Sequence, residues 1–179
     1  MRTLVLGGIR SGKSQWAEET IAKSLPTCRA AVRYLAAGPR GQADPDWAQR
    51  VAEHRSRRPE HWSTVETEDI TTELRQSSST PTLVDDLGGW LTCTLDRHQA
   101  WENGSVAGPV QDMVAAVGAF ESTLVLVSPE VGLMVVPATT SGRRFADELG
   151  TLNQLVAAVC DRVVLVVAGQ ALSIKPSGR

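Results

Sequence analysis

The sequence predicts an α/β fold in which helices cover both faces of a mostly parallel sheet. Three observations lead to this fold class. Apolar runs recur along the 179 residues, segments of helical character separate them, and a phosphate-binding motif follows the first run. Strands that are apolar on both faces are typical of parallel sheets, because helices cover each side. We therefore interpret residues 1–179 as a single nucleotide-binding domain with a well-developed core.

The predicted strands are runs of aliphatic and β-branched residues, which suit a buried, pleated strand. They lie at residues 3–6, 31–35, 82–85, 123–127 and 162–168, with a weaker one at residues 63–66. The predicted helices fill the segments between them, at residues 13–24, 45–56, 70–76, 90–96, 106–120 and 141–160. Pro59 ends the second helix, since proline cannot continue a helix. The polar run at residues 76–81 is a surface connection.

A phosphate-binding loop (P-loop) follows the first strand and precedes the first helix. Its sequence, Gly-Gly-Ile-Arg-Ser-Gly-Lys-Ser, fits G-x-x-x-x-G-K-[ST], a pattern that arises by chance in roughly one chain of this length per hundred. Backbone N–H groups and a helix N-terminus would face the phosphates, Lys13 would add positive charge, and the Ser14 hydroxyl would join a Mg²⁺ shell. The residues expected to hold the nucleotide are Gly7, Gly8, Ile9, Arg10, Ser11, Gly12, Lys13 and Ser14.

Composition limits the remaining function classes. The net charge of −2 gives no general attraction to nucleic acid or to an anionic membrane. The three cysteines are far apart, which argues against a zinc site or a disulfide framework and suits a reducing cytoplasm. The strongly apolar run at residues 163–168 is too short to cross a bilayer. We expect a soluble cytoplasmic protein without a nucleic-acid partner or a membrane span.

Acidic residues end two of the predicted strands. Asp85 follows Thr82-Leu-Val, at the position where P-loop enzymes orient Mg²⁺ or its water shell, although an aspartate there can also cap the next turn. Side chains alternate along a strand, so Asp85 and Asp86 should not both face the nucleotide. Glu130 is a second acid at the same edge, and it could act as a base, a metal partner or a turn cap.

A basic segment surrounds one histidine. Arg50, Arg55, Arg57 and Arg58 lie close to His54 in the sequence, near the end of the second predicted helix. Arginine forks match phosphate oxygens, and a neutral imidazole could attack a phosphorus atom and carry a nucleotidyl group. The alternative is a solvated basic helix face with an idle histidine. The residues alone leave both readings open.

These segments together resemble the bifunctional adenosylcobinamide kinase / adenosylcobinamide-phosphate guanylyltransferase family of cobalamin biosynthesis. The matching pieces run nearly from end to end, and their order and spacing make the resemblance specific. They are the P-loop, Tyr34-Leu-Ala36, His54-Arg-x-Arg-Arg-Pro-x-x-Trp62, Thr64-Val-Glu66, Leu83-Val-Asp85, Val127-Ser-x-Glu-Val-Gly132, Val136-Pro137, Gly142-Arg-Arg-Phe-x-Asp147, Leu152-Asn-Gln154, Leu165-Val-Val-Ala-Gly169 and Ile174-Lys175.

The resemblance implies a RecA-like P-loop fold and two reactions on one corrinoid side chain. ATP or GTP would phosphorylate adenosylcobinamide, and GTP would then guanylylate His54, which passes GMP to the corrinoid phosphate. Lys13 and His54 would be catalytic, and Ser14 and Asp85 would hold Mg²⁺. The further nucleotide contacts that it implies are Ala36, Ala37, Gly38, Arg55, Ser56, Arg57, Arg58, Glu66 and Asp85. Members of the family look like homotrimers.

Two other functions are also compatible with parts of the sequence. A plain P-loop kinase would form no covalent intermediate, so His54 would be dispensable. A non-catalytic nucleotide switch is the other rival, but the chain lacks the Asn-Lys-x-Asp guanine motif of regulatory GTPases. His61 lies beside Trp62, which favours a structural role for that histidine. The sequence leaves open the phosphoryl donor, the corrinoid contacts and whether kinase activity is retained.

Overall fold

One sheet organises the molecule. The computed structural model describes residues 1–27, 29–38, 58–133 and 135–176, and within them seven strands form a sheet in the order β3-β2-β4-β5-β1-β6-β7. The strands are β1 (Arg2–Gly7), β2 (Arg33–Ala37), β3 (Ser63–Thr67), β4 (Thr82–Asp85), β5 (Leu124–Pro129), β6 (Arg162–Val167) and β7 (Gln170–Lys175). Neighbouring strands are parallel except β6 and β7, which are antiparallel. The predicted mostly parallel sheet is therefore confirmed.

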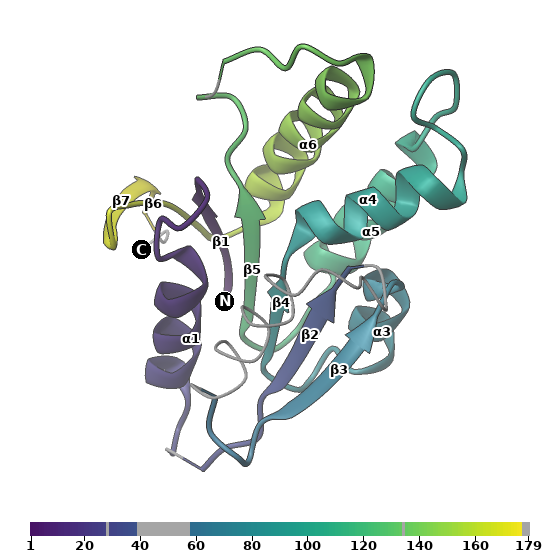
Figure 1. The fold of residues 1–179 in the computed structure, drawn as a ribbon. Helices are drawn as coiled ribbons and strands as arrows, with labels where there is room; N and C mark the ends of the chain where they lie inside the picture. Colours follow the sequence, from purple (N-terminus) through teal and green to yellow (C-terminus); the bar gives the residue numbers. More distant parts are fainter. Residues whose placement is uncertain (28, 39–57, 134, 177–179) are drawn as a thin grey trace.

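Helices lie on both faces of this sheet, as predicted (Figure 1). Those described are α1 (Lys13–Ser24), α3 (Ile70–Gln76), α4 (Leu87–Arg97), α5 (Ala107–Gly118) and α6 (Thr140–Val159). Residues of α1 share one buried cluster with β1, whereas α3, α4, α5 and α6 contribute to a larger cluster on the opposite face. The predicted helix at residues 45–56 lies outside the described residues.

The central strand β1 shows why the sheet is covered on both sides. Leu4 and Leu6 pack into the larger cluster, while Val5, between them, packs against α1 on the other face. Leu4 and Val5 are completely buried. Because side chains alternate along a strand, a run of apolar residues can be buried only if both faces are covered. The β-branched and aliphatic composition of β1 thus places its carboxyl end between two helical layers.

Several predicted boundaries were wrong. The second strand runs two residues later than predicted, so residues 31 and 32 precede it. Strand β6 ends before Ala168, which has a φ of 49° and forms a turn with Gly169. The edge strand β7 was not predicted, since all six of its residues are exposed. Helix α4 begins three residues early, at Leu87, despite the glycines that follow.

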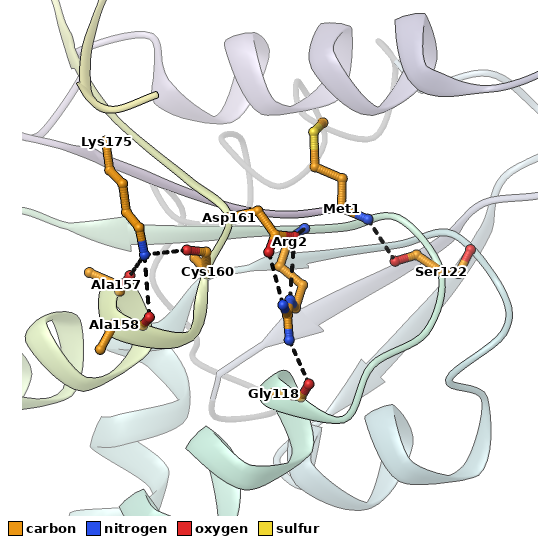
Figure 2. Close-up of polar contacts among 9 residues, drawn as sticks. All are labelled: Met1, Arg2, Gly118, Ser122, Ala157, Ala158, Cys160, Asp161 and Lys175. Carbon is orange, nitrogen blue, oxygen red and sulfur yellow. Dashed lines mark hydrogen bonds and ion pairs between the residues drawn. The ribbon is translucent and has the colours of Figure 1, made fainter. Parts of the chain in front are cut away.

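Polar contacts hold the amino end of the sheet together (Figure 2). The Arg2 guanidinium donates to both carboxylate oxygens of Asp161 and, at 2.5 Å, to the carbonyl of Gly118. Lys175 Nζ donates to the carbonyls of Ala157, Ala158 and Cys160, at the carboxyl end of α6. These contacts join β1, β7 and two helices at the sheet edge opposite the P-loop.

Candidate nucleotide-binding site

The P-loop connects the carboxyl end of β1 to the first turn of α1. Gly12, at the helix N-cap, has a φ of 92°, in the left-handed region that a side chain makes costly. A Cβ atom at Gly12 would also lie 3.2 Å from the Cα atom of Gly169. The second glycine of the motif is therefore required by both backbone conformation and space.

Neighbouring strands support the loop from both sides. Strand β5 leads to Glu130, whose N–H donates to the carbonyl of Gly7 at 3.1 Å. The turn after β6 supplies the N–H of Gly169, which donates to the carbonyl of Ser11 at 2.8 Å. A Cβ atom at Gly7 would approach the Val166 carbonyl within 2.8 Å and meet the Ser11 hydroxyl. Backbone contacts thus hold the loop in one conformation.

Two side chains of the loop make hydrogen bonds at this edge, and one of them reaches Asp85. Lys13 Nζ donates to the carbonyl of Gly8 at 3.3 Å, and the Ser14 hydroxyl donates to Asp85 Oδ1 at 3.4 Å. Strand β5 lies between β1 and β4, so Asp85 reaches the loop across one intervening strand. The structure thus places the Ser14 hydroxyl and the Asp85 carboxylate, both predicted for this edge, within hydrogen-bonding distance.

The oxygen donors at this edge fit Mg²⁺. Mg²⁺ prefers hard oxygen ligands and is usually held by one or two carboxylates together with substrate phosphates. Ser14 and Asp85 offer one hydroxyl and one carboxylate, 3.4 Å apart at their nearest oxygens. Among the residues that the structure describes, no group of three or more His, Cys, Asp or Glu side chains could form a metal cage. The site suits a cation that arrives with a nucleotide.

Asp86 has a different role from Asp85, as strand alternation predicts. It is the N-cap of α4, and its Oδ1 accepts a hydrogen bond from the N–H of Gly89 at 2.8 Å. Burial raises the pKa of Asp86 to about 6, and the neighbouring Asp85 carboxylate acts in the same direction. The N–H groups of the first α4 turn and the Lys13 charge oppose this rise. Ionisation of Asp86 therefore lowers the stability of the folded chain.

Replacing Asp86 with asparagine is expected to stabilise the fold progressively as pH rises from 4 to 7. The folded pKa of about 6 exceeds the unfolded value of 3.8, so the folded chain binds more protons and the wild type loses stability in this interval. Asparagine caps a helix as well as aspartate but does not ionise. Above pH 7 the gain should be on the order of 3 kcal/mol.

Urea unfolding at pH 4, 6 and 7.5 measures this difference. Asp69→Asn makes the same substitution at the exposed N-cap of α3 and serves as the reference for losing a capping carboxylate. An Asp86→Asn stability difference that stays constant across the three pH values would contradict the assignment.

The remaining predicted contacts form a row across the carboxyl edge. Ala36 is in register with Glu66 of β3 on one side and with Asp85 of β4 on the other. Ala37 and Gly38 follow at the end of β2, where Gly38 has a φ of 151°. Glu66 is exposed. The parallel register therefore places these residues at the same edge of the sheet as the P-loop.

The basic segment is only partly described. His54, Arg55, Ser56 and Arg57 lie outside the described residues, whereas Arg58 is placed and is largely buried, with 9% of its side chain exposed. Its guanidinium carbon lies 3.3 Å from the centroid of the Tyr34 ring, and Nη1 donates to the Thr64 hydroxyl at 3.4 Å. Arg58 Nε lies 4.0 Å from Glu18 of α1.

Tyr34 belongs to this site, although it was not predicted to. Its hydroxyl donates to Asp85 Oδ2 at 2.6 Å, and its side chain is almost fully buried. Its position in the sequence, on a predicted strand that leads to the site, is only a weak indication of a role there. It is the chain's single tyrosine.

The two residues left open, Glu130 and His61, are both described. Glu130 Oε1 accepts a hydrogen bond from the N–H of Gly132 at 2.6 Å, which is a turn-capping contact. His61 is exposed, while the adjacent Trp62 is buried.

The fold and this edge define a class of protein. A P-loop at the carboxyl end of a central parallel strand, with serine and aspartate oxygens beside it, is the arrangement of a P-loop NTPase-type α/β protein. The chain belongs to the cobinamide kinase / cobinamide phosphate guanyltransferase family, whose model matches residues 3–174. It is therefore a member of an enzyme family.

Similar proteins cover nearly the whole chain. A bifunctional adenosylcobalamin biosynthesis protein CobP from Pseudomonas aeruginosa is 39% identical over 180 residues, covering 98% of both chains. The bifunctional adenosylcobalamin biosynthesis protein CobU from Escherichia coli is 35% identical, covering 98% of this chain and all of that one. The corresponding Salmonella typhimurium protein is 33% identical with the same coverage.

Among the helices described here, none has the length and apolar character needed to cross a membrane.

Proposed function

We propose that this protein carries out two successive reactions on a corrinoid. It first phosphorylates adenosylcobinamide with ATP or GTP. It then transfers GMP from GTP to adenosylcobinamide phosphate, which yields adenosylcobinamide-GDP and pyrophosphate. The observation that carries the proposal is the family match over residues 3–174, and the contact between Ser14 of the P-loop and Asp85 supports it.

In the first reaction, the P-loop holds the triphosphate so that the substrate hydroxyl can attack the γ-phosphorus. The P–O bond between the γ-phosphorus and the β-phosphate breaks. The proton of the substrate hydroxyl passes to water or to a neighbouring carboxylate. Lys13 neutralises charge that develops on the phosphate oxygens, and Ser14 with Asp85 would hold Mg²⁺, which would supply further positive charge to the phosphates when bound. Positioning and charge neutralisation account for most of the rate in such reactions.

In the second reaction, an imidazole nitrogen of His54 attacks the α-phosphorus of GTP. A P–N bond forms, the bond to the β-phosphate breaks, and pyrophosphate leaves. A phosphate oxygen of the corrinoid then attacks the same phosphorus, and the P–N bond breaks. The covalent intermediate divides one difficult transfer into two easier ones. Arg55, Ser56, Arg57 and Arg58 are proposed to contact and neutralise the phosphates.

The rest of the site would recognise the nucleotide. Ala36, Ala37, Gly38 and Glu66 lie at the carboxyl edge next to Asp85, as the shared register of β3, β2 and β4 supports. We further propose that residues 1–179 form one domain, that three copies assemble into a homotrimer, and that the enzyme works in the cytoplasm.

Labelling with GTP that is radioactive at the α-phosphorus tests the covalent step. We expect the wild type to carry label through denaturing electrophoresis, and the label to be lost in acid but retained in alkali. His54→Ala should abolish labelling, because no other nitrogen would occupy that position. His61→Ala is the matched control: it removes an exposed histidine seven residues further along and should leave labelling intact.

A plain phosphoryl-transfer enzyme is the second candidate, because the described P-loop, Ser14 and Asp85 suffice for that reaction without His54. Unlabelled wild-type protein that nevertheless binds GTP and phosphorylates cobinamide would favour it and exclude the guanylyl-histidine.

A further inference from the structure

We propose that Tyr34 is a positioning residue, whose hydroxyl orients the Asp85 carboxylate toward Ser14 and the Mg²⁺-nucleotide. The proposal rests on the proposed nucleotide site and adds a residue that this site has not included. It starts from a chain of contacts that runs from Arg58 through Tyr34 and Asp85 to Ser14.

The Asp85 carboxylate is held by both of its oxygens. Oδ2 accepts the Tyr34 hydroxyl at 2.6 Å, and Oδ1 accepts the Ser14 hydroxyl at 3.4 Å. The shorter bond comes from the sheet and the longer one from the P-loop helix. A carboxylate fixed at one oxygen presents the other in a defined direction, as hydrogen-bonding partners do for metal ligands in general.

The Tyr34 ring is itself immobilised. Its side chain is 1% exposed and packs in the cluster beneath α1. The Arg58 guanidinium covers the ring, with its central carbon 3.3 Å from the centroid. Because burial and the Arg58 contact fix the ring, the hydroxyl is held in place as a donor to Asp85 Oδ2.

Tyr34→Phe isolates the hydroxyl, because phenylalanine keeps the ring that Arg58 covers. Binding of a fluorescent GTP analogue, followed as Mg²⁺ is added, should show that the half-maximal Mg²⁺ concentration rises about tenfold or more. Binding of the same analogue in EDTA should not change. Thr82→Val is the matched control: it removes a buried hydroxyl at the other end of β4, which donates to the Thr80 carbonyl at 2.8 Å.

A double-mutant cycle distinguishes an effect of Tyr34 through Asp85 from a general disturbance of the structure around the site. If Tyr34 acts through Asp85, Tyr34→Phe should have little further effect on Mg²⁺ dependence in an Asp85→Asn background. Additive effects of the two substitutions would overturn the proposal. So would an unchanged Mg²⁺ requirement in Tyr34→Phe, or an equal loss of binding in EDTA.

A second measurement leaves the protein's fold intact. Tyr34 is the chain's one tyrosine, so incorporation of 3-fluorotyrosine gives a single fluorine resonance. That resonance should move when Mg²⁺ is added to the GTP complex, and should not move in Asp85→Asn. If the chemical shift of this resonance does not change when Mg²⁺ is added to the wild type, the proposed role of Tyr34 is wrong. Failure of the wild type to bind GTP would instead remove the proposed function, and this role with it.

Discussion

Lys13→Met should lower the rate of phosphoryl transfer by about 10²–10³, with little change in stability. The Lys13 ammonium is the mobile charge of the P-loop, and it donates a hydrogen bond to the Gly8 carbonyl at 3.3 Å. Charge that develops on the phosphate oxygens during transfer would lose this partner, whereas the loop keeps its own backbone contacts. Initial rates with cobinamide and ATP or GTP, together with thermal unfolding, measure the two effects.

Lys23→Met is the control for this substitution. It makes the same chemical change in the last turn of the same helix, where Lys23 pairs with Glu19 and is 78% exposed. Its transfer rate should match that of the wild type. If the two variants lose activity equally, the loss comes from α1 and the catalytic role of Lys13 is refuted.

Gly89→Ala should destabilise the protein by about 2 kcal/mol or more, because the added methyl group has no space. A Cβ atom at Gly89 would meet the Ala37 carbonyl oxygen and lie 3.2 Å from the Gly38 Cα atom. Both obstacles are backbone atoms at the end of β2, so no side chain can move aside. Helix α4 or the row that contains Ala36 and Asp85 must shift. The melting temperature should fall by about 5 °C, and nucleotide affinity should fall with it.

Gly150→Ala makes the same change inside α6, where a Cβ atom meets nothing within 4 Å. Here alanine should stabilise by about 0.5–1 kcal/mol, because it lowers the entropy of the unfolded chain and favours helix. Opposite signs at the two positions are the expected result. A stabilising Gly89→Ala would mean that α4 does not approach β2 as closely as described.

Two elements that carry residues of the candidate site could be predicted from the sequence to the residue. The first helix, Lys13–Ser24, and the strand Thr82–Asp85 have the bounds that were predicted. Both are marked by local signals: a glycine-rich turn before the helix, and an aspartate that ends an apolar run. Where a local signal coincides with the tertiary environment, prediction from pattern is reliable.

Other features depend on contacts that no local pattern contains. Gly88 and Gly89 argue against a helix, yet α4 includes both, because Asp86 caps it and the close approach to β2 leaves no room for a side chain. The strand β7 has no buried face to give it a periodic pattern. Tyr34 joins the site through Asp85, which lies far from it in sequence but on the neighbouring strand.

The hydrogen bond from Gly169 to Ser11 also has a consequence for the order of synthesis. The P-loop leaves the ribosome well before the turn that supports it, because Gly169 lies 158 positions after Ser11 in the sequence. At translation rates of about 5–20 residues per second, roughly 10–30 s separate the two. A nascent chain therefore cannot complete the loop's backbone contacts until β6 and its turn have been made. We therefore expect nucleotide binding to develop only in nascent chains that include Gly169.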